Sequence, residues 1–198
     1  EAWLILDADT NGSILHGVRN DIDADALRRA VDQGRAEEAL RRVDVSSGDV
    51  VRVVPGTIHA ICAGVSLLEI QQPSDTTYRV YDYDRPGLDG EPRELHLDDA
   101  LAVANFGEQP PTRQSPKPLA HSEGERQLFI DVDSYRIEQL EGESVVHWRV
   151  DKASPQVIIC LGDPVDLTLS ESDEDVRLER YETAVIPSSG RRVSASPV

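Results

Sequence analysis

The chain has 198 residues, of which 39% are hydrophobic and 29% are charged. This composition is typical of a globular protein with one sizeable core or two small domains. The formal net charge of −17 argues against nucleic-acid binding, because such binding needs a basic surface. Two cysteines, Cys62 and Cys160, and the lack of a long apolar run predict a cytoplasmic protein without disulfides or membrane contacts.

The chain opens with the pattern of a β-hairpin. Residues 2–8 are apolar with little alternation, which is typical of a strand buried on both faces. Residues 9–12 carry a turn signal, Asp-Thr-Asn-Gly, and residues 13–18 are suited to the returning strand.

The period of the pattern then changes from strand to helix. Asp23 or Asp25 can cap a helix that ends at Gly34. Residues 36–43 repeat the helical spacing of apolar side chains. We therefore expect a short helical insertion over about residues 23–43.

The remainder of the chain is mostly β in pattern. Three apolar runs predict strands: DVVRVV at 49–54, IHAICAGVSLLEIQQ at 58–72 and TTYRVYDY at 76–83. A Pro-rich stretch over 107–120 indicates a linker, and short alternating runs over 121–198 indicate a small β-sandwich or half-barrel. The predicted fold is mainly β, with one domain over residues 1–106 and a second after the linker.

One histidine lies in a distinctive turn pattern. Gly48-Asp49 begins a strand that runs up to Pro55-Gly56, and a second turn then brings His59 to the inside of the predicted barrel. This pattern resembles the second metal-binding motif of the cupin superfamily. A lone histidine on an apolar strand is more often a hydrogen-bonded core residue, so the neighbouring residues decide its role.

Together with LLEIQQPSDTTYRVYD at 67–82, the pattern resembles one family, the type I mannose-6-phosphate isomerases in their short bacterial form. The resemblance implies a cupin-like β-barrel or jelly roll over residues 1–106. It also implies a smaller, degenerate cupin-like β-sandwich over 121–198, where Ser188-Ser189-Gly190 stand at the place at which a histidine would be expected.

The resemblance extends to the metal ligands. EAWLILDA at residues 1–8 resembles the strand that begins with a zinc-ligand glutamate in this family. It implies that Glu1 and His59 bind one zinc ion per subunit. Two further ligands from a Gln-x-His-Pro segment, and a lysine, would precede Glu1. We therefore expect a truncated form that needs the missing ligands for activity.

Three further residues are predicted to act on the substrate. Interconversion of an aldose and a ketose phosphate moves a proton between C1 and C2 through an enediol, and zinc can polarise the substrate oxygens. Arg79 lies in the segment that resembles the catalytic-arginine motif, and its guanidinium can face an oxyanion or phosphate. Glu69 and Asp75 are candidates for proton transfer or for orienting neighbours. The alternatives are a surface salt bridge for Arg79 and structural roles for both acids.

The other histidines show no metal-ligand spacing, and we expect them to be structural or exposed: His16, His96, His121 and His147. Arg85 can assist phosphate binding or remain solvated.

The predicted function is that of a mannose-6-phosphate isomerase, which interconverts mannose 6-phosphate and fructose 6-phosphate. The alternative is a non-catalytic cupin that binds a sugar phosphate as a sensor or regulatory subunit, and a third reading is a β domain used for assembly. The expected partner is a small sugar phosphate, without nucleic acid or membrane. The oligomeric state stays open.

Overall fold

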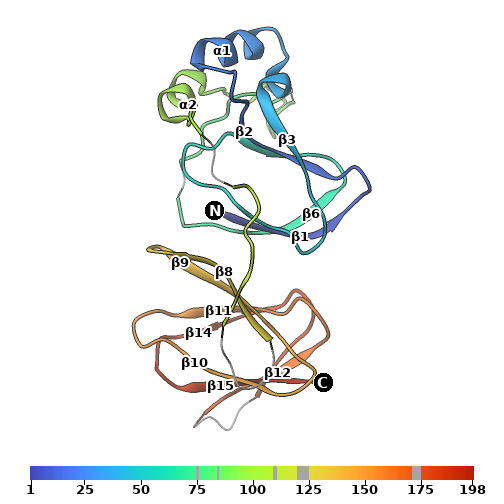
Figure 1. Cartoon of the computed structure of the whole chain (residues 1–198), viewed down its shortest axis with the longest axis vertical. Helices are drawn as coiled ribbons and strands as arrows, with labels where there is room; N and C mark the ends of the chain where they lie inside the picture. The colour runs from blue at the N-terminus through green and yellow to red at the C-terminus, as the bar shows by residue number, and fades with distance from the viewer. Residues whose placement is uncertain (75, 84, 109–110, 120–124, 171–174) are drawn as a thin grey trace. The chain divides into compact units, whose positions relative to one another are not determined.

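A computed structural model of the chain describes residues 1–74, 76–83, 85–108, 111–119, 125–170 and 175–198. It divides into two compact units, the first comprising Glu1–Ser115 with Val132–Tyr135 and the second Pro116–Asp131 with Arg136–Val198. Antiparallel strands dominate both units, which confirms the predicted mainly-β fold class (Figure 1).

The first unit contains two three-stranded antiparallel sheets with the strand orders β4-β1-β6 and β3-β2-β5. Its elements are β1 (Ala2–Ala8), β2 (Ser13–Val18), α1 (Ala24–Asp32), the 3₁₀ helix η1 (Ala36–Ala39), β3 (Leu40–Asp44), β4 (Val50–Arg52), β5 (His59–Ile61), β6 (Val65–Ile70) and α2 (Leu97–Val103). Apolar side chains from both sheets share a core, among them Trp3 and Ile5 of β1 and Ile14 of β2. Side chains of β3 and β6 also pack against this core.

The helices lie together at one end of the first unit (Figure 1). Helix α1 begins after Asp23, whose carboxylate accepts a hydrogen bond from the Ala26 backbone N–H at 2.7 Å. Leu27 and Val31 of α1 pack against the buried side chains of β2, because their spacing places both on one face of the helix.

The second helical stretch predicted over residues 36–43 is wrong in its second half. Only Ala36–Ala39 form a 3₁₀ helix, and the chain then continues as β3. Pairing with β2, which joins Leu40 to Val18 and Val43 to Ile14, outweighs the helical spacing of the apolar residues.

The strand predicted over residues 76–83 is also absent from the described part of this segment. Tyr81 packs against the core around α1, and Tyr83 adopts a positive φ of 56°, which interrupts an extended strand. The buried Asp82 carboxylate accepts hydrogen bonds from Arg93 and Arg85, and these guanidiniums lower its pKa to about 2. The segment is therefore held as an irregular loop.

Part of the predicted linker pairs with β4. The Arg52 N–H donates to the Thr112 carbonyl at 3.2 Å, and the Gln114 N–H donates to the Val50 carbonyl at 2.7 Å. Residues in this stretch therefore extend the sheet beside β4.

The second unit is entirely β in its described residues, with sheets ordered β10-β15-β12-β13, β11-β14 and β7-β8-β9. Its strands, apart from Val132 of β8 and Tyr135 of β9, which belong to the first unit, are β7 (Lys117–Pro118), β8 (Glu125–Val132), β9 (Tyr135–Glu141), β10 (Val146–Arg149), β11 (Gln156–Ile159), β12 (Val165–Leu169), β13 (Asp175–Leu178), β14 (Thr183–Ile186) and β15 (Arg192–Pro197). Trp148 and Leu167 are among its buried core residues.

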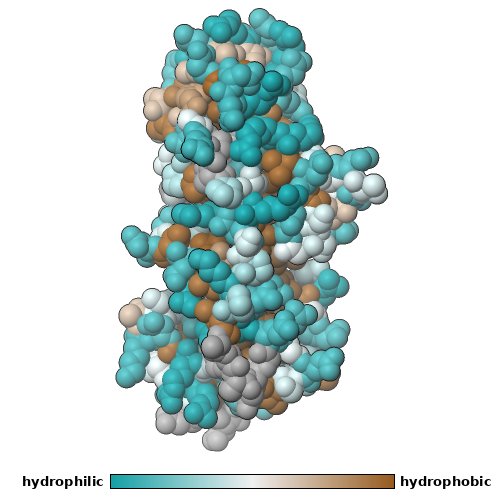
Figure 2. Space-filling view, viewed as in Figure 1, coloured by the Kyte–Doolittle hydropathy of each residue, from teal (hydrophilic) through white to brown (hydrophobic). Residues whose placement is uncertain are grey.

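The visible surface is largely hydrophilic, with small and separate apolar patches (Figure 2). Both cysteines are free. Among the described residues, the helices are too short or too polar to cross a membrane.

Candidate functional site

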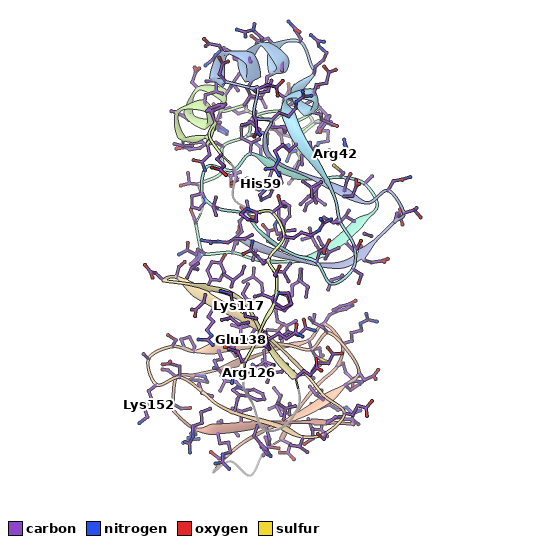
Figure 3. All side chains as sticks on the ribbon, viewed as in Figure 1. Arg42, His59, Lys117, Arg126, Glu138 and Lys152 are labelled. Atoms are coloured by element: carbon purple, nitrogen blue, oxygen red, sulfur yellow. The ribbon has the colours of Figure 1, made fainter. Side chains whose placement is uncertain are left out.

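Three of the residues predicted to act in the site come together in the first unit. Glu1 directly precedes β1, Glu69 lies in β6, and His59 begins β5 (labelled in Figure 3). Side chains alternate along a strand, so Glu1 and Trp3 share one face of β1, and the sheet register places Trp3 opposite Glu69. The site thus combines one element of the β3-β2-β5 sheet with two elements of the β4-β1-β6 sheet.

The orientation of His59 is fixed by a backbone hydrogen bond. Its Nδ1 lies 2.8 Å from the Thr57 carbonyl oxygen, and since a carbonyl can only accept, Nδ1 carries the proton and donates. In the neutral ring, Nε2 then keeps its lone pair, and it lies 3.5 Å from Oε1 of Glu1. The side chains of His59 and Glu1 are 31% and 23% exposed, so ligands from solvent can reach both.

Glu1 and Glu69 form an interacting carboxyl pair. Burial raises the pKa of Glu1, and a hydrogen bond with Glu69 raises it further. The same hydrogen bond is the largest cause that lowers the pKa of Glu69, followed in the same direction by the indole N–H of Trp3 at 3.4 Å. Glu69 is therefore the member of the pair that ionises first.

His16 lies opposite His59 in the β2–β5 register but has different partners. It is fully buried, its Nε2 donates to the Arg52 carbonyl at 3.0 Å, and its Nδ1 accepts from the Thr112 hydroxyl at 3.2 Å. Burial lowers the pKa of His16, which favours the neutral ring. Both ring nitrogens are used, which is consistent with a structural role.

The chemistry of Glu1 and His59 fits a zinc ion. Ligands at Zn–N and Zn–O bond lengths in a tetrahedral site lie about 3.4 Å apart. The 3.5 Å between His59 Nε2 and Glu1 Oε1 agrees with that spacing. Within the described residues, no group of three or more His, Cys, Asp or Glu side chains is arranged to hold a metal. The distance between the two side chains is therefore compatible with two ligands of a tetrahedral set.

Arg79 makes its polar contacts with a different segment. Its backbone N–H donates to Nδ1 of His96 at 3.2 Å, and its Nη1 donates to the Glu94 carbonyl oxygen at 3.1 Å. The described contacts do not join it to Glu1, His59 or Glu69. Asp75 lies outside the described residues.

Other expectations resolve into structural contacts or lie outside the described chain. Arg85 forms an ion pair with Asp82 at 2.6 Å. His96 accepts the backbone hydrogen bond from Arg79, His147 is exposed in β10, and His121 lies outside the described residues.

Sequence reasoning missed Trp3 and Thr57. Trp3 touches both Glu69 and His59, the latter at 5.2 Å between ring centroids. Trp3 lies two residues after Glu1, and residues two apart in a strand share a face, so strand alternation could have predicted that Trp3 lies near the site. The carbonyl of Thr57 carries no signal in the sequence, because any residue offers one.

Comparison with known proteins finds several relatives among isomerases. The chain is 45% identical over 103 residues to the mannose-6-phosphate isomerase ManA of Bacillus subtilis, covering 52% of this chain and 32% of ManA. It is 33% identical over 150 residues to the probable mannose-6-phosphate isomerase GmuF of the same organism, covering 76% and 44%. The chain thus spans less than half the length of these curated relatives. A scan of protein-family models finds no match.

Solved structures show the same fold. The crystal structure of the mannose 6-phosphate isomerase from Bacillus subtilis matches with a TM-score of 0.87 and 26% identity, covering 98% of this chain and 60% of that one. A zinc-bound mannose 6-phosphate isomerase matches with a TM-score of 0.64 and 14% identity, covering 98% and 62%. The predicted cupin fold is confirmed by these matches.

Proposed function

We propose, from the premise that this chain is a homologue of the mannose-6-phosphate isomerases, that it acts in the metal-dependent interconversion of mannose 6-phosphate and fructose 6-phosphate. The observation that carries the proposal is the facing pair formed by His59 Nε2 and Glu1 Oε1 at 3.5 Å. Zinc is the metal we propose, because the N and O donors suit it and a zinc-bound isomerase shares the fold.

Each residue has a distinct proposed task. Glu1 and His59 would hold the metal, which when bound supplies a Lewis acid that polarises the sugar carbonyl. The Thr57 carbonyl keeps the proton of His59 on Nδ1, so that Nε2 remains free to bind. Glu69, whose pKa is lowered by its hydrogen bond with Glu1, is ionised at neutral pH and can accept a proton.

The proton transfers in the reaction define the role that we propose for Glu69. Isomerisation removes the proton from C2 of mannose 6-phosphate and returns a proton to C1, while a hydroxyl proton passes from O2 to O1. We propose that Glu69 carries the carbon-bound proton. Asp75 remains the second candidate from the sequence.

Arg79 is the proposed cation that faces the oxyanion or phosphate of the substrate. One of its guanidinium donors is used by the Glu94 carbonyl. The remaining donors have no partner within the described part of the chain, and a guanidinium stays charged at every pH of interest.

The test is the formation of fructose 6-phosphate from mannose 6-phosphate by the full-length natural protein that contains this chain. Replacing Arg79→Ala should lower kcat/KM by about 100-fold or more, since it removes an electrostatic contact to developing negative charge. The exposed Arg113, which pairs with Asp49, provides the matched control Arg113→Ala. Undiminished turnover in Arg79→Ala would remove Arg79 from the mechanism, and no turnover in the wild type would refute the function.

A second candidate function is a non-catalytic cupin that binds a sugar phosphate. The observation in its favour is that no third ligand joins Glu1 and His59 among the described residues. Two measurements separate the candidates: calorimetry for the binding of mannose 6-phosphate, and an assay for the formation of fructose 6-phosphate. A sensor binds the sugar phosphate but forms no fructose 6-phosphate.

A further inference from the structure

Trp3 links the two residues that contact Glu1. It is 2% exposed, and the sheet register places it directly opposite Glu69. Its indole Nε1–H donates to Oε1 of Glu69 at 3.4 Å. Its ring also meets the imidazole of His59 edge to face, with centroids 5.2 Å apart and planes at 74°. One buried side chain thus touches both neighbours of Glu1.

The chemistry of indole makes these contacts directional. The indole has a single donor and no acceptor, so its N–H selects a carboxylate oxygen and restrains the Glu69 side chain. The edge-to-face contact restrains the tilt of the His59 ring, whose other restraint is the Thr57 carbonyl. Because Trp3 is packed in the core with Ile5 and Val51, its own position is fixed.

We infer that Trp3 is a positioning residue that fixes His59 and Glu69 relative to Glu1 and thereby sets the affinity of the site for a divalent metal. The inference rests on the proposed function for the identity of that metal. Residues that orient metal ligands from the surrounding shell typically contribute 10- to 100-fold to metal affinity, and the contact with His59 places Trp3 in that shell.

The chain carries its own matched control. Trp148 is the second of two tryptophans, is 7% exposed, and donates its indole N–H to Oε1 of Gln156 at 2.8 Å. It lies in the core of the second unit. Both tryptophans are therefore buried and bonded to a side-chain oxygen, but only Trp3 contacts the candidate site.

The first arm of the test is nuclear magnetic resonance of the two indole N–H groups in the ¹⁵N-labelled 198-residue chain. The variants Trp3→Phe and Trp148→Phe assign the two signals. Replacement of Glu69→Gln should move the Trp3 signal alone, because it removes the charge from the acceptor. Titration with zinc should then move the Trp3 signal and leave the Trp148 signal in place.

The second arm measures zinc affinity by competition with a chromophoric chelator. Trp3→Phe keeps an aromatic edge but removes the donor, and it should weaken zinc binding about tenfold. Trp148→Phe should bind zinc as the wild type does. A merely structural role for Trp3 would lower the melting temperature of Trp3→Phe while leaving the zinc affinity of the folded protein unchanged.

Three outcomes overturn the inference: equal zinc affinity in wild type and Trp3→Phe, a Trp3 signal that stays fixed at saturating zinc, or no zinc binding by the chain. If Trp3→Phe fails to fold, the wild-type titration decides alone. The proposed function is tested separately, by isomerisation. If zinc affinity depends on Trp3 but no isomerisation is found, the proposed isomerase function is refuted and the inference about Trp3 still holds.

Discussion

Two histidines in the same register of the β2–β5 pair show how hydrogen bonds separate a structural residue from a ligand. His16 uses both ring nitrogens, one toward the Arg52 carbonyl and one toward the Thr112 hydroxyl. His59 uses only Nδ1 and keeps Nε2 for the space beside Glu1. The difference lies in their partners, which sequence spacing alone does not specify.

The buried His16 predicts a pH dependence of stability. Burial lowers the pKa of His16 in the folded protein below the unfolded value of 6.5. Between these two pKa values the unfolded chain therefore binds a proton at His16 that the folded chain does not bind. The free energy of unfolding should therefore fall as the pH drops below 6.5 toward the folded pKa. His16→Gln keeps an amide donor and cannot titrate, so this part of the pH dependence should disappear.

The measurement is the melting temperature between pH 7.5 and 5.5 in the presence of a chelator, with the exposed His147→Gln as control. If the melting temperature of His16→Gln depends on pH as strongly as that of the wild type, His16 is not the source of the pH dependence.

The family resemblance predicts Glu1, His59 and Glu69 as site residues, and the structure brings these three side chains together. It could not show that Arg79 contacts the Glu94 carbonyl, since that contact depends on the path of an irregular loop. The role of Asp75 stays a prediction.

At the scale of elements, the turn before β5 determines where His59 lies. Gly56 has φ of +82°, and its carbonyl accepts from the Asn105 N–H at 2.8 Å, which ties the turn to the end of α2. The Asn105 side chain adds a second bond at 2.8 Å to the Pro55 carbonyl. The sequence predicts the Pro-Gly turn but not this partner, which lies about 50 residues further along.

Gly48 and Gly56 both have a positive φ, but only Gly56 lies close to another segment of the chain. Comparing alanine variants of the two therefore distinguishes the cost of backbone strain from the cost of a steric clash. A Cβ at Gly56 would lie 2.5 Å from the Val103 carbonyl oxygen, whereas a Cβ at Gly48, with φ of +87°, meets nothing within 4 Å. Gly48→Ala should cost about 1–2 kcal/mol for the left-handed conformation alone. Gly56→Ala should cost about 1–3 kcal/mol more, because the turn must move.

Urea unfolding of the two variants measures the difference. Zinc affinity should fall only in Gly56→Ala, since that turn precedes His59. Equal stability losses in the two variants would show that the contact with Val103 does not hold the turn.

The two wrong element predictions have a common physical cause. Residues 40–43 fit a helix by spacing, but β2 offers strand partners to Leu40, Arg42 and Val43, with a register shift between Leu15 and Val18. Residues 76–83 fit a strand by alternation, but Asp82 is held by two arginines and Tyr83 adopts a positive φ. In both cases tertiary contacts outweigh local pattern.

At the scale of the whole molecule, the net charge of −17 opposes the binding of an anionic sugar phosphate. The proposed function therefore needs local positive charge, from the metal at Glu1 and His59 and from the guanidinium of Arg79. This requirement connects the composition of the chain to its candidate site.

The most direct test of this account is the zinc dependence of isomerisation in the full-length natural protein that contains this chain. Metal is stripped with EDTA, zinc is added back, and fructose 6-phosphate is measured in the wild type, His59→Ala and His147→Ala. We predict that zinc restores the wild type and His147→Ala, while His59→Ala stays at least about 100-fold less active. Recovery of His59→Ala to the wild-type rate, or isomerisation that persists in EDTA, would contradict the account.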